Sequence, residues 1–133
     1  KGLISIDYSI KDYSSASFST DTYIRNPSIN SEINNALTNN SELRVGGEYK
    51  IEAFSLRAGY RFEKSPYKNK KIMGDLNGYS GGIGYDFGST KLDISYATAK
   101  RNSQQQFFSQ GFTDGPAIRN QSSTITATLL FEL

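Results

Sequence analysis

Apolar and polar residues alternate with a period of two in six separate stretches of this 133-residue chain. In the clearest stretch every second residue from Phe54 to Phe62 is apolar, and serine, arginine and glycine fill the positions between them. Successive side chains of a strand point to opposite faces of its sheet, so each stretch predicts a strand with one apolar and one polar face. We expect these strands near residues 3–13, 41–51, 54–63, 78–87, 90–99 and 122–133.

The connections between the expected strands are alternately long and short. Two are tight turns, one directly after Ile51 and one at residues 88–90, and both have the length of hairpin turns. The other three are long and polar, at residues 14–40, 64–77 and 100–121. This alternation predicts an all-β, antiparallel up-and-down sheet in which every long loop lies at the same end.

The first long connection carries the signal of a helix. Asn26 precedes Pro27 as an N-cap precedes a proline at the first helical position, and Ile29, Ile33 and Leu37 then recur at helical spacing. We predict a short amphipathic helix from Pro27 to Leu37, and a loop that packs its own few apolar side chains is the alternative. Such a helix is suited to lie over the mouth of a barrel.

The polar faces of the expected strands carry charges of both signs among small residues. One interpretation is the solvated face of a soluble antiparallel sheet. The other turns the apolar residues outward to lipid and the charges toward a lumen, as in transmembrane β-barrels. Runs of nine or more residues, the loop asymmetry and aromatic residues near strand ends, such as Tyr85 and Phe87, favour the barrel. Seven charged residues are then expected to face the lumen: Asp7, Glu42, Arg44, Glu48, Arg57, Arg61 and Asp93.

Arginine and glutamate positions of the expected lumen face lie near one another on neighbouring strands. We expect inward-pointing ion pairs with a mainly structural role. These pairs would join Arg44, Arg57 and Arg61 to Glu42, Glu48 and Glu63. Paired carboxylates for acid–base chemistry are the less favoured interpretation of the same face.

The composition excludes several classes of chemistry. The chain contains no cysteine and no histidine, so a disulfide framework, a thiolate nucleophile, a serine-type triad and an ordinary zinc site are excluded. A net charge of only +2 argues against a strongly basic nucleic-acid binder. We therefore expect no catalytic residue, cofactor, metal site or nucleic-acid partner.

Three short motifs are assigned ordinary structural roles. Residues 81–84 (GGIG) lack the helix and the acidic residue that a dinucleotide fingerprint requires, so strand glycines are expected. Residues 75–78 (DLNG) lack the rest of a calcium loop, so a plain turn is expected. Residues 68–71 (KNKK) are expected to form a solvated loop, with contact to anionic lipopolysaccharide as the alternative.

Six strands are fewer than a closed membrane barrel needs. The smallest single-chain outer-membrane barrels have eight, and an open edge in lipid leaves backbone groups unpaired. The chain also opens with Lys1-Gly2, without a methionine or a leader. We expect it to be the C-terminal portion of a larger barrel, partnered by missing N-terminal strands, membrane lipid and lipopolysaccharide. With the long loops outside a Gram-negative outer membrane, we expect the C-terminus in the periplasm.

The segment from Glu42 to Ala97 carries an ordered set of short motifs. They are ELRVGGEY at 42–49, LRAGY at 56–60, the pair Ser65-Pro66, YSGGIGY at 79–85 and KLDISYA at 91–97. The combination resembles the C-terminal half of the FadL/OmpP1/TodX family of outer-membrane transport proteins, in versions from Bacteroidetes. The last strand, with Phe131 two positions before the end, also resembles the C-terminal signal by which outer-membrane barrels are recognised for insertion.

The resemblance implies the last six strands of a barrel of about fourteen. It also implies passive diffusion of long-chain fatty acids or similar hydrophobic compounds across the outer membrane. The plug and the laterally opening strand of the family would lie upstream of this chain. Relatives of the fold that serve protein secretion imply an alternative, a barrel acting as a binding or scaffold subunit among other outer-membrane subunits. For a hydrophobic ligand, the expected external-loop contacts are Ile33, Leu37, Phe107, Phe108 and Phe112.

Overall fold

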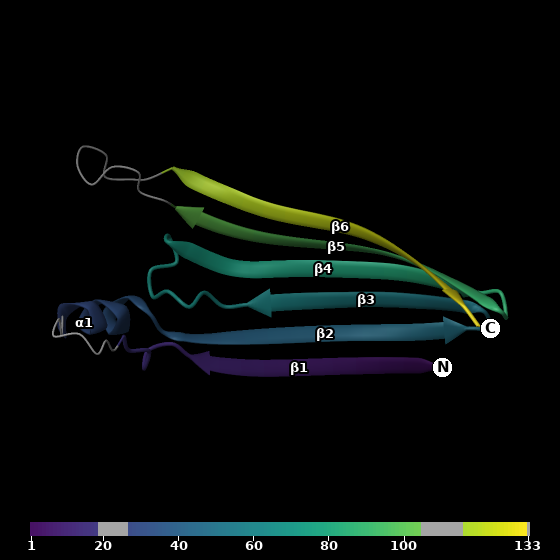
Figure 1. The fold of residues 1–133 in the computed structure, drawn as a ribbon, viewed down its shortest axis with the longest axis horizontal. Helices are drawn as coiled ribbons and strands as arrows, with labels where there is room; N and C mark the ends of the chain where they lie inside the picture. Colours follow the sequence, from purple (N-terminus) through teal and green to yellow (C-terminus); the bar gives the residue numbers. More distant parts are fainter. Residues whose placement is uncertain (19–26, 105–115, 133) are drawn as a thin grey trace.

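A computed structural model describes residues 1–18, 27–104 and 116–132 of the chain, as one curved layer of six antiparallel strands with a single helix (Figure 1). The elements are β1 (Gly2–Asp12), α1 (Pro27–Ala36), β2 (Asn39–Ile51), β3 (Phe54–Glu63), β4 (Met73–Asp86), β5 (Thr90–Gln104) and β6 (Ala117–Phe131). In these described ranges, no helix has both the length and the apolar character needed to cross a membrane.

The strands follow one another across the sheet in the order of the chain, which confirms the predicted up-and-down topology. Only Glu52 and Ala53 separate β2 from β3, and Glu52 adopts the left-handed backbone conformation (φ 50°) that so short a turn requires. The turn from β4 to β5 uses Gly88, which has a φ of 97°. The strand ends that the three long connections join all lie at the opposite end of the sheet from these two turns (Figure 1).

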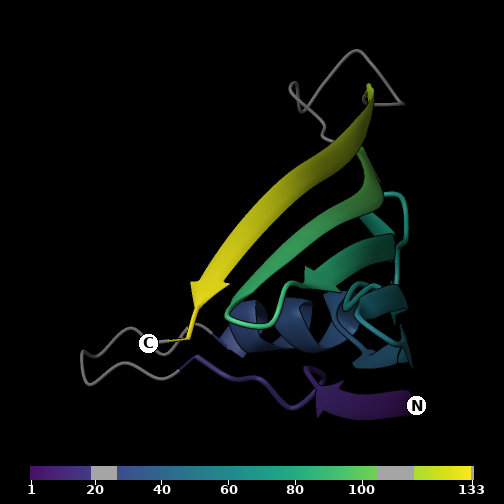
Figure 2. The ribbon, with the colours of Figure 1, turned by 90° about the vertical axis from the view of Figure 1, so that its right-hand side faces the viewer.

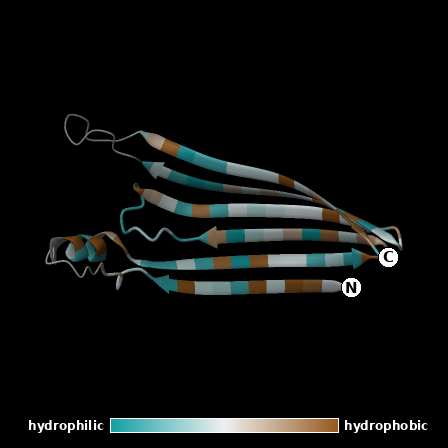
Figure 3. Ribbon diagram, viewed as in Figure 1, coloured by the Kyte–Doolittle hydropathy of each residue, from teal (hydrophilic) through white to brown (hydrophobic). Residues whose placement is uncertain are grey.

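The register aligns the polar positions of all six strands on one face and the apolar positions on the other. One row of paired residues crosses the whole sheet on the polar face: Ser5, Gly46, Gly59, Ser80, Ala97 and Thr124. The neighbouring row on the apolar face is Ile4, Gly47, Ala58, Gly81, Tyr96 and Ile125. Figure 3 shows the resulting alternation of hydropathy along the strands.

The sheet has no covering layer. Among the described residues no apolar side chain is buried, and the buried residues are Asn40, Glu42, Ser65, Gly78 and Gly84. Ile83 is 48% exposed and Leu129 53% exposed, although both lie within the apolar face. The apolar face therefore does not form the closed internal core of a soluble sheet.

The sheet is strongly curved about its long axis (Figure 2). The polar face is the inner, concave face, because a broad groove of the sheet is lined by polar-face residues such as Ser5 and Ser80. The apolar face is the outer, convex face. The outermost strands β1 and β6 do not pair with each other or with any other described strand along their free edges.

Three predicted boundaries were wrong, because β4, β5 and β6 extend farther toward the long loops than expected. Residues 73–77, 100–104 and 117–121 belong to strands, and Lys100 pairs with Gln121 in this extension. Polar residues predominate there and the few apolar ones, such as Met73 and Ile118, do not alternate with them, so the hydropathy alternation ends while the backbone ladder continues. The plain turn expected at 75–78 is also strand, with a register shift between Met73 and Leu76.

Candidate functional site

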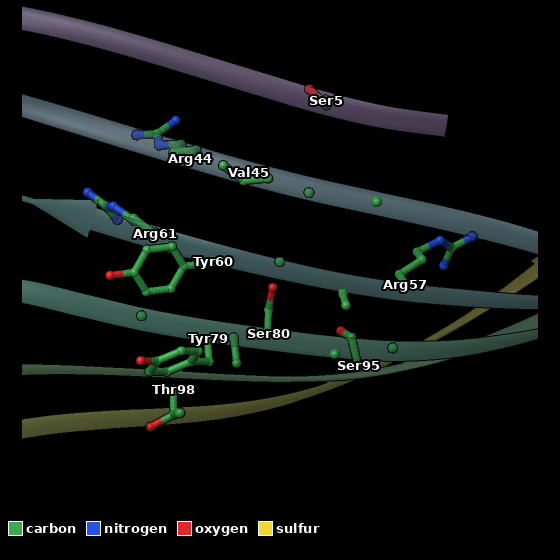
Figure 4. A pocket seen from close by; sticks show the side chains of 18 of the residues that line it. Ser5, Arg44, Val45, Arg57, Tyr60, Arg61, Tyr79, Ser80, Ser95 and Thr98 are labelled. Atoms are coloured by element: carbon green, nitrogen blue, oxygen red, sulfur yellow. The ribbon is translucent and has the colours of Figure 1, made fainter. Parts of the chain in front are cut away.

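The concave face forms an open groove of about 740 Å³. Its floor is the row of small residues that crosses the sheet, so the backbone lies close to the groove along its whole width. Figure 4 shows Arg44 and Arg61 together on neighbouring strands, with Arg57 farther along β3 and Ser80 and Ser95 beside the open space. The groove therefore has charged side chains on one part of its wall and small ones on another.

The first charged cluster lies at the end of the groove nearest the long loops. Glu42, which is 7% exposed, accepts a hydrogen bond from Nε of Arg44 (2.7 Å) and pairs with Nε of Arg61 (2.6 Å). Arg61 also reaches Glu63 (3.0 Å), and Arg101 of β5 lies 3.0 Å from the other oxygen of Glu63. Two carboxylates thus hold three arginines from β2, β3 and β5 in one network.

The second charged cluster lies nearer the tight turns. Arg57 pairs with Glu48 (3.2 Å) on β2 and donates a short hydrogen bond to Asp93 on β5, across the intervening strand β4. Gly84 of β4 lies beneath this bridge, and a Cβ atom at that position would overlap the Asp93 carboxylate. The absence of a side chain at position 84 is what allows the ion pair to cross β4.

The ion pairs expected from the sequence are present, with changes of partner. Glu42 is shared by Arg44 and Arg61, and Asp93 joins Glu48 as a partner of Arg57. Asp7 lies opposite Arg44 in the register and forms no ion pair within the described part of the chain. Every one of the seven expected lumen residues lies on the concave face.

The groove wall on β4, β5 and β6 was not singled out from the sequence. It consists of Gly78, Ser80, Gly82, Ser95, Ala97, Ala99, Ser122 and Thr124, with no charged member. Each strand carries small residues at alternate positions, but only the pairing register brings these positions together. The small residues are visible in the sequence of each strand, but the sequence does not show which of them lie side by side on neighbouring strands.

At the long-loop end, α1 confirms the predicted helix and ends at Ala36, one residue earlier than expected. The chain after it is fastened to the β3–β4 connection: the Thr38 amide donates to the Pro66 carbonyl (2.8 Å), and Leu37 forms a β-bridge with Tyr67. Viewed along the strands, α1 lies on the inner side of the curve (Figure 2). Ile33 and Leu37 are both half-buried, whereas Phe107, Phe108 and Phe112 lie outside the described residues.

The β3–β4 connection is organised around Ser65, whose side chain is completely enclosed. Its hydroxyl accepts a hydrogen bond from the Tyr67 amide (3.1 Å) and donates to the Met73 carbonyl, while its own amide donates to Asp75 (2.8 Å). Partial burial acts to raise the pKa of Asp75, but the hydrogen bonds from Lys70 (2.8 Å) and Ser65 outweigh it and hold that pKa below its usual value. The Ser65-Pro66 motif therefore fixes a compact loop.

The described residues contain no group of three or more acidic side chains that could hold a metal ion. Comparison of the chain with protein-family models, with curated proteins and with solved structures found no match.

Proposed function

We propose that the six strands are part of the wall of a transmembrane β-barrel in a Gram-negative outer membrane, with the convex face in lipid and the C-terminus in the periplasm. The barrel is closed by further strands that pair with β1 and β6. The proposal rests first on an apolar face without any buried apolar side chain in the described residues. A single layer in water would leave this face exposed, whereas lipid covers it at no cost.

The observation that carries the proposal is the oblique edge of the apolar face. Toward the long loops, the last apolar residues of the convex face are, from β1 to β6, Ile10, Leu43, Phe62, Tyr79, Tyr96 and Ile125. Ile10 pairs with Ser41, two residues beyond Leu43, and two further offsets of two residues follow from β3 to β4 and from β4 to β5. The edge therefore crosses the sheet as a slanting line.

The slope of this line gives a strand tilt. Six residues of offset correspond to about 20 Å along the strands, and the five spaces between six strands to about 24 Å across them. If the edge lies parallel to the membrane surface, the strands tilt by about 40° from the membrane normal, within the 35–45° typical of outer-membrane barrels. On β3 the apolar positions run from Phe54 to Phe62, which at this tilt gives a band about 20 Å tall, close to the 25 Å of such barrels.

Aromatic side chains mark both edges of the apolar face, beginning with the edge at the tight-turn end. Tyr85 packs edge-on against Phe54 (ring centroids 4.7 Å apart) and against Phe87 (4.5 Å) on the convex face. At the other edge Tyr60 and Tyr79 pack together (5.2 Å). Aromatic rings gather at both membrane interfaces in proteins of this class.

We further propose that the barrel conducts long-chain fatty acids or similar hydrophobic compounds by passive diffusion, without a cofactor or covalent chemistry. The groove combines three arginines and two carboxylates on β1–β3 with a neutral wall of small residues on β4–β6. An arginine binds a carboxylate headgroup well, and a smooth wall accommodates a flexible acyl chain beside it. The choice of a fatty acid depends also on the resemblance to the FadL family, which is an analogy.

Uptake of labelled oleate by cells tests this function. Deletion of the full-length gene is expected to lower uptake, and the wild-type gene to restore it. Ala97→Trp, which fills the groove, is expected to lower uptake several-fold, because Ala97 lies on the groove floor. Ala127→Trp is the matched control, since Ala127 lies two residues from Ile125 on the convex face.

Both variants must keep the heat-modifiable migration of a folded barrel on a gel. Equal uptake by the deletion strain and the wild type would contradict the transport proposal. Unchanged uptake together with a stoichiometric protein partner in pull-downs would favour the scaffold subunit instead. Absence of the protein from outer-membrane fractions would contradict the barrel itself.

A further inference from the structure

Two cations stand on the convex face above the edge of the apolar band. In the extended part of the β5–β6 hairpin, Lys100 pairs with Gln121 and Asn102 pairs with Arg119. All four side chains are exposed and share the face of Tyr96 and Ile125, because they lie at even spacing from them along the same strands. They form a patch of four N–H donors, which we call the hairpin patch.

The hairpin patch has no acidic counterpart among the described residues. Neither Lys100 nor Arg119 forms an ion pair within the described part of the chain. Asp93 is the one acidic residue in the β5 and β6 strands, and it lies on the concave face. The four arginines of the concave face, by contrast, are all paired with carboxylates.

Two lysines of the β3–β4 connection, at the same end of the sheet, are engaged. Lys68 donates to the Asn34 carbonyl (2.9 Å), and Lys70 pairs with Asp75 (2.8 Å). The basic cluster at 68–71, the more conspicuous one in the sequence, is thus used to build the β3–β4 connection. The two cations of the hairpin patch are left without such a role.

The height of the hairpin patch matches that of lipid phosphates, provided the strands tilt as proposed above. Lys100 lies four residues beyond Tyr96, about 13 Å along the strand and about 10 Å above the apolar edge. The polar headgroup layer extends roughly 5 to 8 Å beyond the hydrocarbon on each side. Long basic side chains reach several ångströms toward the interface, so both cations can meet a phosphate there.

We propose that the hairpin patch binds the phosphate groups of a lipopolysaccharide-type lipid in the outer leaflet. Lys100 and Arg119 are diagonal neighbours on adjacent strands, about 7 to 8 Å apart at the backbone, so one phosphate can lie between their side chains. Two like charges at this spacing repel each other until an anion bridges them. Gln121 and Asn102 supply further N–H donors on either side. This partner assignment rests on the proposed membrane barrel.

The test uses the full-length protein reconstituted in phosphatidylcholine vesicles that contain diphosphorylated lipid A or, in parallel, lipid A without its phosphates. The measured quantity is the lipid A retained per protein molecule after extraction into detergent, read by native mass spectrometry over a lipid titration. Wild type is expected to retain the phosphorylated form preferentially. Lys100→Gln with Arg119→Gln is expected to lower its apparent affinity about 30-fold, since each cation near an anionic lipid contributes about fivefold.

Two control variants define the site. Lys11→Gln removes another exposed lysine that forms no ion pair in the described ranges, but on the concave face, and is expected to leave retention unchanged. Lys100→Arg with Arg119→Lys keeps both charges and is expected to keep binding. Inorganic phosphate added to the vesicles serves as a competitor and distinguishes a site for free phosphate from one that requires the lipid.

Each outcome bears on the proposal. Equal retention of the two lipid A forms, equal retention by the double glutamine variant, or full displacement by inorganic phosphate at concentrations near that of the lipid would overturn it. If the protein also migrates as a heat-modifiable barrel, the membrane barrel survives and only the phosphate site fails. Failure of the wild type to insert into any vesicle would instead contradict the barrel proposal.

Discussion

The two halves of the sheet share one backbone ladder, but they line the concave groove with side chains of different character. Within the groove, β1–β3 carry charged residues that are linked by ion pairs, and β4–β6 carry glycine, serine, alanine and threonine. The charged half, β1–β3, is fixed by side chains that span two or three strands. The small half, β4–β6, leaves open space, and its own charged residues, such as Asp93 and Arg101, lie beyond the groove lining. The ion pairs of β1–β3 thus stiffen one part of the groove wall, and the small residues of β4–β6 provide the open space beside it.

The halves differ at the long-loop end as well. Above β1–β3 the chain builds a compact cap from α1 and the connection around Ser65. Toward the long loops β4, β5 and β6 continue as an extended ladder, in which Met73 pairs with Ser103 and Ser103 with Ile118. The apolar band extends farthest toward the long loops on β1 and least far on β5 and β6, as the proposed strand tilt requires.

The largest expected effect separates positions at different heights of the convex face. Ala58→Arg inserts a charge at the middle of the apolar band on β3 and is expected to cost about 2–4 kcal/mol of unfolding free energy in vesicles. Ser123 lies on the convex face of β6, two residues beyond Ile125 and so outside the apolar band on the long-loop side. Ser123→Arg is therefore expected to cost only about 0–1 kcal/mol. Urea titrations of the full-length protein in lipid vesicles measure both, and equal costs would contradict the oblique edge.

The next effect concerns the bridge that joins the two halves. Gly84→Ala forces the Asp93 carboxylate away from Arg57, because the new Cβ would overlap it, and about 1–3 kcal/mol of destabilisation is expected. Gly46→Ala is the matched control on the concave face, since its Cβ would meet nothing closer than 3.8 Å. The same urea titrations apply. A Gly84→Ala variant as stable as Gly46→Ala would show that the bridge tolerates displacement.

A smaller effect follows from removing the cation at the centre of this bridge. Arg57→Ala leaves Asp93 without its cation and leaves Glu48 with only Lys50, 3.7 Å away. The side chain of Arg57 is 44% exposed, so water screens the loss and about 1 kcal/mol is expected, not the several that a dry site would cost. Ser80→Ala in the small half is expected to change the stability by less than about 0.5 kcal/mol. Loss of the heat-modifiable form in Arg57→Ala would indicate a dry lumen.

The smallest effect lies where the cap meets β4. The folded-state pKa of Asp75 is below its unfolded value of about 3.9, so the stabilisation from its carboxylate is complete above that pH and disappears as the pH falls through the folded value. Amide hydrogen exchange of Ser65, whose N–H donates to Asp75, is expected to lose protection at acidic pH. Asp75→Asn is expected to remove this pH dependence of protection, and a pH-independent protection factor of the Ser65 amide in the wild type would contradict the assignment.

Strand order, the two faces and the helix could be predicted from the sequence, because each depends on a local period or cap. The outer extensions of β5 and β6 could not. Around Asn102 and Arg119 polar residues lie on both faces, and the strands are held by backbone hydrogen bonds that leave no hydropathy pattern. The ladder continues there because a hairpin already in register gains a further pair at little entropic cost.

The ion pairs illustrate the same limit at longer range. Arginine and glutamate on adjacent strands could be matched from the predicted order, as for Arg57 and Glu48. The bond from Arg57 to Asp93 requires the register of three strands and the missing side chain of Gly84, neither of which a local pattern contains. The cluster around Ser65 was likewise hidden, because its hydrogen bonds are made mainly to the backbone.

The sequential strand order has a consequence for how such a wall is assembled. Each strand pairs only with its predecessor and its successor, so the ladder can grow one hairpin at a time without waiting for a distant segment. Every addition satisfies one strand edge and creates another, which then serves as the template for the next strand. No described strand contains a proline to stop this growth. In the proposed barrel, elongation would end at the seam, where the first edge and the last one meet a common set of partners.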